Sequence, residues 1–375
     1  NTNFTAAEKQ DLTDDILPLA GELGNRNKVI NGSMICSQRG TSETGVNSSG
    51  YKNAPDRWTH QIASSQSAYT VSQSTDSPDG FANSYKIDVT TADTSLHADH
   101  VHFFRQKIEG QNLQDFAKGT SSAKQFALSF YVKTTKTGTY VLELYDVDNS
   151  RQISKTYTVS DTNWNRYTLI FPADTTGAFG NDNGNSFAVQ FYLSAGANYT
   201  SGTLNSSAWA SSTQANRAVG QVNFDDSTSN DWYLTGVQLE VGSVVTEFEH
   251  RSFAQELSLC ERYCQTVLDG SDANNSGQHD IAGQAYTANN IFIIPQTRTK
   301  MRAAPSASIT TGSNYYNVFS DGNSTIFADL ALDRSSPNSA TIALTNATGT
   351  TIGAKQTAFV RTNNTSAKIL LIAEL

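Results

Sequence analysis

The chain has 375 residues, more than one hydrophobic core usually organises, so two folded units with short appendages are expected. Only 16% of the residues are charged and 37% are hydrophobic, while Ser, Thr, Asn and Gly are abundant, which favours short strands and polar turns over helices. The net charge of −9, without a run of Lys or Arg, argues against nucleic acid and membrane surfaces as partners, and no apolar stretch approaches the roughly 20 residues that cross a bilayer.

Residues 1–25 predict a helical segment. Thr5 and Glu8 have the spacing of a capping box, and Leu12 and Ile16 follow at helical intervals before Pro18 breaks the run. The segment is too short to form a core of its own. We expect it to attach the chain to neighbouring proteins, and its polar start does not resemble a secretion signal.

Residues 26–250 alternate between short extended runs and turns rich in Gly, Asn, Pro and Asp, a pattern typical of an antiparallel sandwich or jelly roll. The clearest hairpin candidate joins 126–133 to 139–145 through Thr137 and Gly138. The other predicted strands are 29–30, 34–38, 58–63, 85–89, 102–108, 154–159, 166–171, 187–193, 222–224 and 232–241.

A helix is predicted within residues 251–269, capped by Ser252, because apolar residues repeat there at helical intervals. After a polar linker, a second set of strands predicts a smaller β-sandwich over 270–375. The three cysteines are too few for a disulfide framework and indicate reduced thiols made in a cytoplasm. Cys260 and Cys264 would share one face of the helix as buried apolar residues, and Cys36 stands alone.

Several motifs occur in a fixed order along the chain. They are Asn27-Lys-Val-Ile-Asn-Gly-Ser-Met34, Ser37-Gln-Arg-Gly-Thr41, Gln73-Ser-Thr-Asp-Ser-Pro-Asp-Gly-Phe81, Arg105-Gln-Lys-Ile-Glu-Gly110, Leu128-Ser-Phe-Tyr-Val-Lys133, Tyr233-Leu-Thr-Gly-Val-Gln-Leu-Glu-Val-Gly242, Glu247-Phe-Glu-His-Arg251, Glu256-Leu-Ser-Leu-Cys-Glu-Arg-Tyr263, Met301-Arg-Ala-Ala-Pro305 and Ala373-Glu-Leu375. In this order they resemble a family of phage tail-fibre and virion structural proteins, and the resemblance extends from Asn25 onward.

The resemblance implies a jelly roll like that of carbohydrate-binding modules in a virion component, commonly a homotrimer, without a catalytic site. The motif residues also have a structural interpretation: Val237, Leu239 and Val241 alternate as a buried strand face, and Gly236 permits a close approach. Cys264 stands where the family more often has an aromatic residue. The final residues resemble the family's usual ending, so we expect this end to be native.

Metal ligands are sparse in the sequence. His100 and His102 would point the same way from a strand and could share an ion, although buried or solvated imidazoles explain them as well. Asp182, in Asp-Asn-Gly-Asn, and the pair Asp225-Asp226 offer oxygen ligands of the type calcium uses, but turn chemistry explains them more simply. We expect no cofactor, with calcium as the alternative.

Sugar recognition depends on aromatic faces beside planar polar groups, so aromatic residues in polar loops are the informative ones. Trp209, Tyr199, Tyr315 and Tyr316 are the candidates for glycan binding. Trp58, Trp164 and Trp232 lie in strand-like patterns and are expected in the core. No nucleophile elbow, P-loop or dinucleotide fingerprint occurs, and no pair of carboxylates stands out, so we expect no enzymatic activity.

These features lead to one preferred function and two alternatives. The preferred function is a fibre-type virion protein, made in the bacterial cytoplasm, that attaches through residues 1–25 to other virion proteins and displays a face for a host-surface glycan. A capsid-decoration or head-fibre protein is the first alternative. A polysaccharide-degrading enzyme is the second, and the absence of a parallel β-helix repeat argues against it.

Overall fold

A computed structural model describes residues 24–272, 280–287, 290–312, 315–320, 323–327, 330–345 and 353–375. The helix expected within residues 1–25 lies almost wholly outside the described residues. The chain divides into two compact units. The first unit contains the residues up to Met34, Thr44–Gly50 and Trp58–Arg251, and the second contains Ile35–Glu43, Tyr51–Arg57 and Ser252–Leu375.

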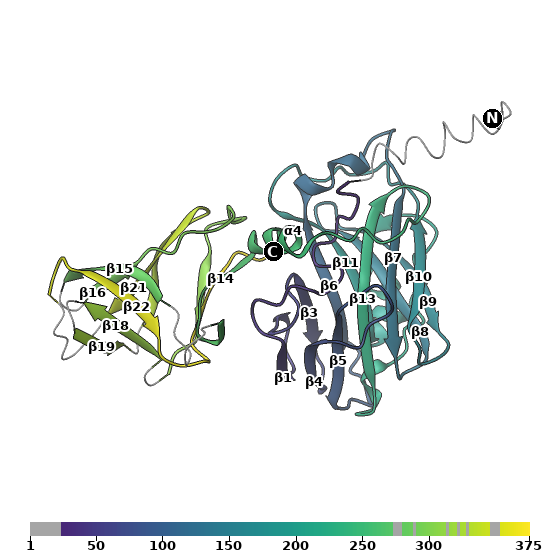
Figure 1. Ribbon diagram of the computed structural model, residues 1–375. Coiled ribbons are helices and arrows are strands. Elements are labelled where there is room, and N and C mark those ends of the chain that lie inside the picture. The colour runs from purple at the N-terminus through teal and green to yellow at the C-terminus, as the bar shows by residue number, and fades with distance from the viewer. Residues whose placement is uncertain are drawn as a thin grey trace, which may run out of the picture. The chain divides into compact units, whose positions relative to one another are not determined.

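Two antiparallel sheets build the first unit (Figure 1). The six-stranded sheet has the order β1 (Ser42–Val46), β4 (Ala68–Ser74), β5 (Ser84–Thr91), β13 (Asp231–Val241), β7 (Phe126–Thr134) and β10 (Asn165–Phe171). The seven-stranded sheet has the order β12 (Ala210–Ser211), β9 (Arg151–Val159), β8 (Gly138–Asp146), β11 (Asn185–Ala195), β6 (Val101–Glu109), β3 (Trp58–Ala63) and β2 (Gly50–Tyr51). Short helices occupy the connections: η2 (Gly110–Asn112), η3 (Gln114–Phe116), α3 (Ala197–Thr200), η4 (Gln214–Asn216) and η5 (Phe224–Asp226).

Aromatic rings from the two sheets interlock in the core of the first unit. Phe104 of β6 stacks on Trp58 with ring centroids 5.1 Å apart and meets the edge of Trp232 from the opposite sheet at 6.1 Å. Phe130 of β7 meets Phe191 of β11 at 5.0 Å. Trp58 and Trp232 are buried as predicted, whereas Trp164 is only partly buried. These contacts join the two sheets into one sandwich.

The hairpin predicted between 126–133 and 139–145 is wrong, although both strands form. β7 pairs with β13 and β10 in one sheet, while β8 pairs with β9 and β11 in the other. The connection therefore crosses between the sheets, and the backbone N–H of Thr135 donates to Asp231 at its start. Alternating polarity indicates which face of a strand is buried, but it does not say which strand lies beside it.

Three of the sequence motifs meet in the first unit. Asn27 caps the edge of β13, because its side chain donates to the carbonyl of Val237 and accepts from the backbone N–H of Leu239. The backbone N–H of Asn27 donates to Glu249 at 2.9 Å, and Arg251 donates to the Asn27 carbonyl. The motifs at 27–34, 233–242 and 247–251 thus form one structural node.

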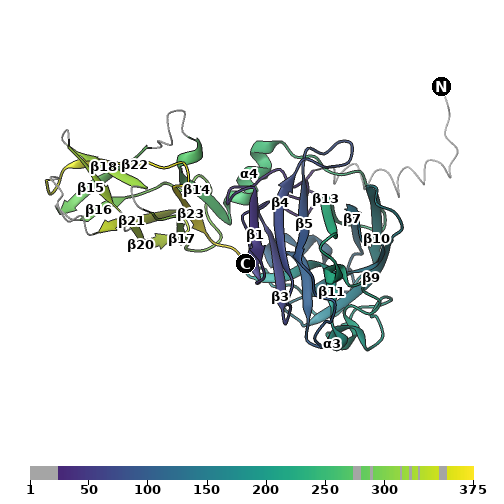
Figure 2. The ribbon, with the colours of Figure 1, turned by 90° about the horizontal axis from the view of Figure 1, so that it is seen from below.

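The second unit is a smaller sandwich of a seven-stranded and a three-stranded sheet (Figure 2). The larger sheet has the order β19 (Asn323–Phe327), β18 (Tyr316–Ser320), β22 (Thr357–Thr362), β15 (Asp280–Thr287), β16 (Asn290–Ile293), β21 (Ser339–Thr345) and β20 (Leu330–Ser336). The smaller sheet has the order β14 (Cys264–Asp269), β23 (Lys368–Ile372) and β17 (Ser306–Ile309). Between them lies an aliphatic core in which Leu268 and Ile369 face Ile291, Val318 and Val360. The prediction of an all-β chain built from antiparallel sandwiches is confirmed.

The helix predicted within 251–269 forms only in its first part. α4 spans Phe253–Glu261 and begins with the predicted Ser252 cap, whose hydroxyl accepts from the backbone N–H of Gln255. Residues Cys264–Asp269 form β14 instead, because β-branched Thr266 and Val267 suit a strand and the backbone can pair with β23. η6 (Gly270–Asp272) follows β14.

This ending of the helix separates the two cysteines that were expected on one helical face. Cys260 is on α4 and Cys264 begins β14. Both are buried free thiols, as is Cys36. Burial raises the pKa of the Cys260 thiol well above its ordinary value, so the residue is an unreactive part of the core.

A second node of motifs lies in the second unit. Arg39 and Arg57 both pair with the Glu374 carboxylate, the former at 2.9 Å. Arg302 donates to the backbone carbonyls of Ala373 and Glu374, at 2.8 Å each. The Arg57 guanidinium lies 3.4 Å above the ring of Tyr263. The motifs at 37–41, 256–263, 301–305 and 373–375 therefore meet around Glu374 and the arginine that it shares with Tyr263.

Candidate functional site

The outer side of the seven-stranded sheet in the second unit exposes several aromatic rings. In β22, Ala358 and Val360 point into the core, so Phe359 and Arg361 point outward, and Phe359 remains 53% exposed. Tyr286 of β15 is 68% exposed. We call this surface the aromatic face, and it consists of Asp280, Gln284, Tyr286, Phe292, Phe319, Phe359 and Arg361.

Strand register brings these residues together. Phe359 is opposite Phe319 of β18, and Arg361 is opposite Asp280 of β15. Gln284 is opposite Phe292 of β16. Paired residues of antiparallel strands share a side of the sheet at about 5 Å, so these side chains form a continuous surface.

A salt bridge supplies the polar part of the aromatic face. Arg361 donates through Nε and Nη2 to the two carboxylate oxygens of Asp280, at 2.6 and 2.9 Å, and its guanidinium lies 4.7 Å above the Phe319 ring. These hydrogen bonds from Asp280 raise the pKa of Arg361 above its ordinary value. The pair has no net charge, and its planar groups stand beside the rings.

Tyr286 and Phe292 form the other part of the aromatic face. Their ring centroids are 5.9 Å apart, and Ile294, 61% exposed, continues the row from Phe292. Large exposed apolar patches are unusual on soluble proteins and mark binding surfaces. Rings that offer a flat apolar surface next to planar hydrogen-bonding groups suit ligands with C–H faces and hydroxyl edges, which is the chemistry of saccharides.

Two of the aromatic residues predicted to bind glycan are buried. Trp209 is 8% exposed, packs on Phe126 and Phe187, and donates its indole N–H to the Pro172 carbonyl at 2.8 Å. Tyr316 is fully buried, and its hydroxyl donates to the Thr310 carbonyl. The prediction that these rings face a ligand is wrong, because each anchors its loop or strand to a core instead.

Tyr199 and Tyr315 are partly buried and belong to different units. Tyr199 packs on a cluster on the outer side of the first unit's seven-stranded sheet, where Phe103 and Tyr192 are covered. Burial raises the pKa of the Tyr199 hydroxyl. Tyr315 packs against the core of the second unit. Neither ring is among the exposed large apolar side chains of the described residues.

His100 and His102 do point the same way, but they share a carboxylate. Both rings are fully buried and lie beside Asp225, at 3.2 Å from Nε2 of His100 and 3.4 Å from Nδ1 of His102. His60 joins His102 at 3.2 Å and the Tyr85 hydroxyl at 2.9 Å. No group of three or more His, Cys, Asp or Glu side chains among the described residues could hold a metal ion.

The other atoms around His100 resemble a catalytic triad only in composition. Its Nε2 is 2.6 Å from the Ser194 hydroxyl and its Nδ1 is 3.5 Å from Asp93. All of these groups are buried, so a substrate has no access to Ser194. Although burial opposes ionisation, His102, His100 and Ser194 hold the pKa of Asp225 well below its usual range. The group is a charged part of the sandwich core.

Asp182 serves a turn, as the simpler interpretation predicts. Its carboxylate accepts from the backbone N–H of Gly184 at 2.8 Å, and its carbonyl accepts from Gln111 at 3.0 Å. Asp226, the second half of the other acidic pair, forms a salt bridge with Lys136 at 2.5 Å. The Asp182 contacts are those of a turn, and Asp226 is paired with a lysine.

Sequence reasoning missed the residues of the aromatic face because it searched for aromatic residues in polar loops. The signal was in the strands instead. In Thr357-Ala-Phe-Val-Arg-Thr362 the aromatic residue shares a side with arginine while the small and branched apolar residues take the other side. A strand that is apolar on its core side and aromatic on its charged side indicates an exposed ring.

Comparisons with known proteins add little to these observations. No protein-family model matches the chain, and no curated protein matches it in sequence. The enzymatically active domain of tailspike protein 4 from bacteriophage CBA120 is similar at 14% identity and a TM-score of 0.29, over 57% of this chain and only 21% of that one.

Carbohydrate-binding modules are similar at the same level. The family 11 module from Clostridium thermocellum, in complex with a β-1,3-1,4-mixed-linked tetrasaccharide, has 10% identity and a TM-score of 0.28 over 56% of this chain and 99% of that one. The C-terminal family 22 module of Clostridium thermocellum Xyn10B has 13% identity and a TM-score of 0.28 over 56% and 98%. At these scores the likenesses carry no argument about function.

Within the described residues no helix is both long enough and apolar enough to span a membrane.

Proposed function

We propose that the chain is a fibre-type structural component of a bacteriophage virion and that the aromatic face of its second unit binds a glycan of the host surface. The observation that carries the binding role is the set of exposed rings on one side of the seven-stranded sheet, with the Arg361–Asp280 pair beside Phe319 and Phe359. Phe359 and Tyr286 are exposed by 53% and 68%, although the strands that hold them are packed on the other side. Such exposure is costly to solubility and is retained where a surface has a ligand.

The virion role is supported by the order of sequence motifs. Seven of those ten motifs form two structural nodes, one in each unit, and none of the ten includes a residue of the aromatic face. Attachment through residues 1–25 and assembly as a homotrimer belong to the same proposal. Sedimentation of the purified chain measures the oligomer, and immunogold labelling of particles separates a tail fibre from a capsid decoration.

The polar groups of the aromatic face favour a saccharide as its occupant. A charged pair and the Gln284 amide interrupt the rings, so hydrogen-bonding groups stand next to apolar ring faces. A sugar polymer uses both kinds of group, because its C–H faces stack on rings and its hydroxyls bond to planar polar groups. The proposal is of binding without catalysis, and incubation with host polysaccharide should yield no shortened products.

A glycan array tests the binding role. The full chain should bind a subset of bacterial surface glycans, and Phe359→Ala should weaken that binding about tenfold, the effect of losing one stacked ring. Phe253→Ala is the matched control, because Phe253 on α4 is 58% exposed and lies outside the aromatic face. Binding that survives combined Phe359→Ala and Tyr286→Ala substitutions contradicts the proposed site.

A further inference from the structure

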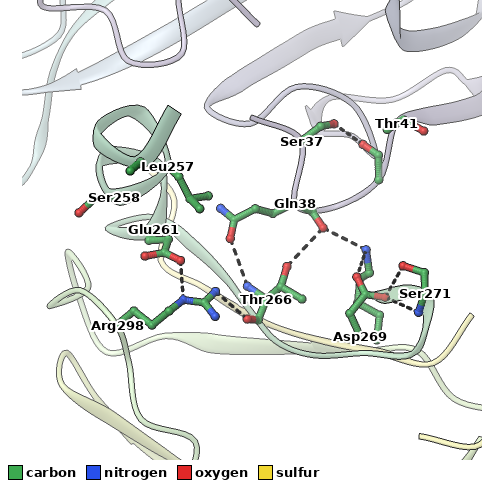
Figure 3. A pocket seen from close by; sticks show the side chains of 13 residues that line it. Ser37, Gln38, Thr41, Leu257, Ser258, Glu261, Thr266, Asp269, Ser271 and Arg298 are labelled. Atoms are coloured by element: carbon green, nitrogen blue, oxygen red, sulfur yellow. Dashed lines mark hydrogen bonds and ion pairs between the residues drawn. The ribbon is translucent and has the colours of Figure 1, made fainter. Parts of the chain in front are cut away.

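A polar pocket of about 680 Å³ lies within the second unit (Figure 3). Its walls come from α4, from the segment Ser37–Thr41, and from β14 with the turn that follows it. The volume is in the range of pockets that hold small ligands. Unlike most such pockets, this one is lined chiefly by polar side chains and contains no aromatic ring.

The walls of the pocket are rigidly held. Leu257, Ser258 and Glu261 face it from α4 because residues three and four apart share one side of a helix. Opposite them, the Gln38 amide donates to the Cys264 carbonyl at 2.7 Å, and the Gln38 carbonyl accepts from Lys368 at 3.1 Å. A pocket fixed in this way loses little conformational entropy when a ligand binds.

The charges of the pocket cancel in pairs. Arg298 donates through Nε to Glu261 at 2.5 Å, and Lys368 contacts Asp269 at 2.7 Å. These are the four charged residues of the lining, two of each sign. An ionic ligand would lose its hydration and find each opposite charge already neutralised, so the pocket disfavours both anions and cations.

Hydrogen-bonding capacity remains beside the Arg298–Glu261 pair. Glu261 is 5% exposed and accepts from Arg298 through Oε1, while no residue in the described part of the chain donates to its Oε2. Arg298 uses Nε and Nη2 in these contacts, and its side chain is 58% exposed. The buried Glu261 carboxylate thus keeps an acceptor at Oε2, and Ser258 and the apolar Leu257 belong to the same lining.

We propose that this pocket binds a small neutral polyhydroxylated ligand with the chemistry of a single sugar unit. Each hydroxyl both donates and accepts, so one sugar hydroxyl can donate to Glu261 Oε2 while another accepts from the Arg298 guanidinium. Leu257 supplies the surface for C–H groups. The site is separate from the aromatic face, and the inference does not depend on the proposed function.

Saturation-transfer NMR and calorimetry on the full chain test the proposal. The probes are methyl α-glucoside, methyl α-galactoside and N-acetylglucosamine, with sodium sulfate as the anion. At least one sugar should bind and sulfate should not. Glu261→Gln and Arg298→Gln should each weaken sugar binding at least tenfold. Arg334→Gln, at a side chain 86% exposed in the same unit, should leave it unchanged.

A second variant keeps the test decisive if the buried Glu261 proves intolerant of change. Ser258 lines the pocket from an exposed position on α4, so Ser258→Leu should preserve folding while its larger apolar side chain crowds the site, and sugar binding should be lost. Binding of sulfate in place of the sugars, no binding of any sugar, or sugar binding that survives Ser258→Leu overturns the proposal. Phe359→Ala should retain pocket binding, so failure here is distinguishable from failure of the aromatic face.

Discussion

Replacement of Glu374 by glutamine should destabilise the second unit strongly. Glu374 is the shared partner of Arg39 and Arg57, whose side chains are 6% and 1% exposed. Glutamine keeps the shape of the side chain and removes its charge. Arg39 retains a contact with Asp56 at 3.4 Å, but the buried guanidinium of Arg57 loses the carboxylate at its Nη1.

The size of the effect follows from the burial of these charges. Removal of one member of a buried ion pair costs about 3–5 kcal/mol, because the remaining charge loses its counter-ion at a site away from water. Arg57 still lies over the Tyr263 ring, which offsets part of the loss. If the backbone amides of β14 and β23 exchange their hydrogens through opening of the second unit, this range corresponds to amide hydrogen exchange roughly 150- to 5,000-fold faster.

Hydrogen exchange followed by mass spectrometry measures this effect separately in each unit. Peptides from β14 and β23 report on the second unit, since Cys264 pairs with Ile372 and the Ala373 amide donates to Tyr263. All four tryptophans belong to the first unit, so their fluorescence reports on that unit instead. Asp333→Asn, which breaks an exposed contact with Arg334, is the control and should leave exchange unchanged.

The reasoning is refuted if Glu374→Gln leaves exchange in β14 and β23 within about threefold of the wild-type rate. That result would mean that the two arginines are hydrated in solution and that the motif node stabilises little.

Two further predictions concern the first unit. The pKa of Asp225 is lower in the folded than in the unfolded chain, where it is near 3.8, so its ionised carboxylate stabilises the first unit above that pH and the stabilisation is lost as the pH falls further. Asp225→Asn should therefore lower the unfolding free energy followed by tryptophan fluorescence at neutral pH and weaken its dependence on pH below about pH 4. An unchanged acid profile contradicts this. Gly236→Ala should lower the unfolding free energy by more than the about 1–2 kcal/mol that a positive φ costs alanine, because its Cβ would lie 2.8 Å from Phe81 and Tyr131. Gly220→Ala, also at positive φ but in open space, should lose only that backbone contribution. Equal unfolding free energies for the two variants contradict this.

The sequence predicts the class of fold well because the spacing of apolar residues within a segment indicates which of its side chains are buried. Alternation identified most strands of the first unit, and the Ser252 cap located the start of α4. The predicted strands at 29–30, 34–38 and 222–224 do not form. Pairing between distant strands is not local, so β7 and β8 were joined in a hairpin that the structure does not contain. The helix was extended too far because helical spacing of apolar residues continued into Thr266 and Val267, where pairing with β23 decides the conformation.

The residues of the candidate site were harder to predict from the sequence than the fold. A polar loop around Trp209 indicated exposure, yet the ring is held in a core by Phe126 and Phe187. Tyr286 was overlooked because aromatic residues in strands are usually buried, and Phe359 because no strand was predicted over Thr357–Thr362. Their exposure depends on which side of the sheet meets the three-stranded sheet, and that is decided by tertiary packing.

Oxidative footprinting with and without a bound glycan tests the central claim most directly. The glycan is one that the array identifies, and hydroxyl radicals label exposed rings. Bound glycan should protect Tyr286 and Phe359 while the exposed Phe253 on α4 stays reactive. Protection of other residues, with Tyr286 and Phe359 labelled as fast as in the free protein, would contradict the assignment of the aromatic face.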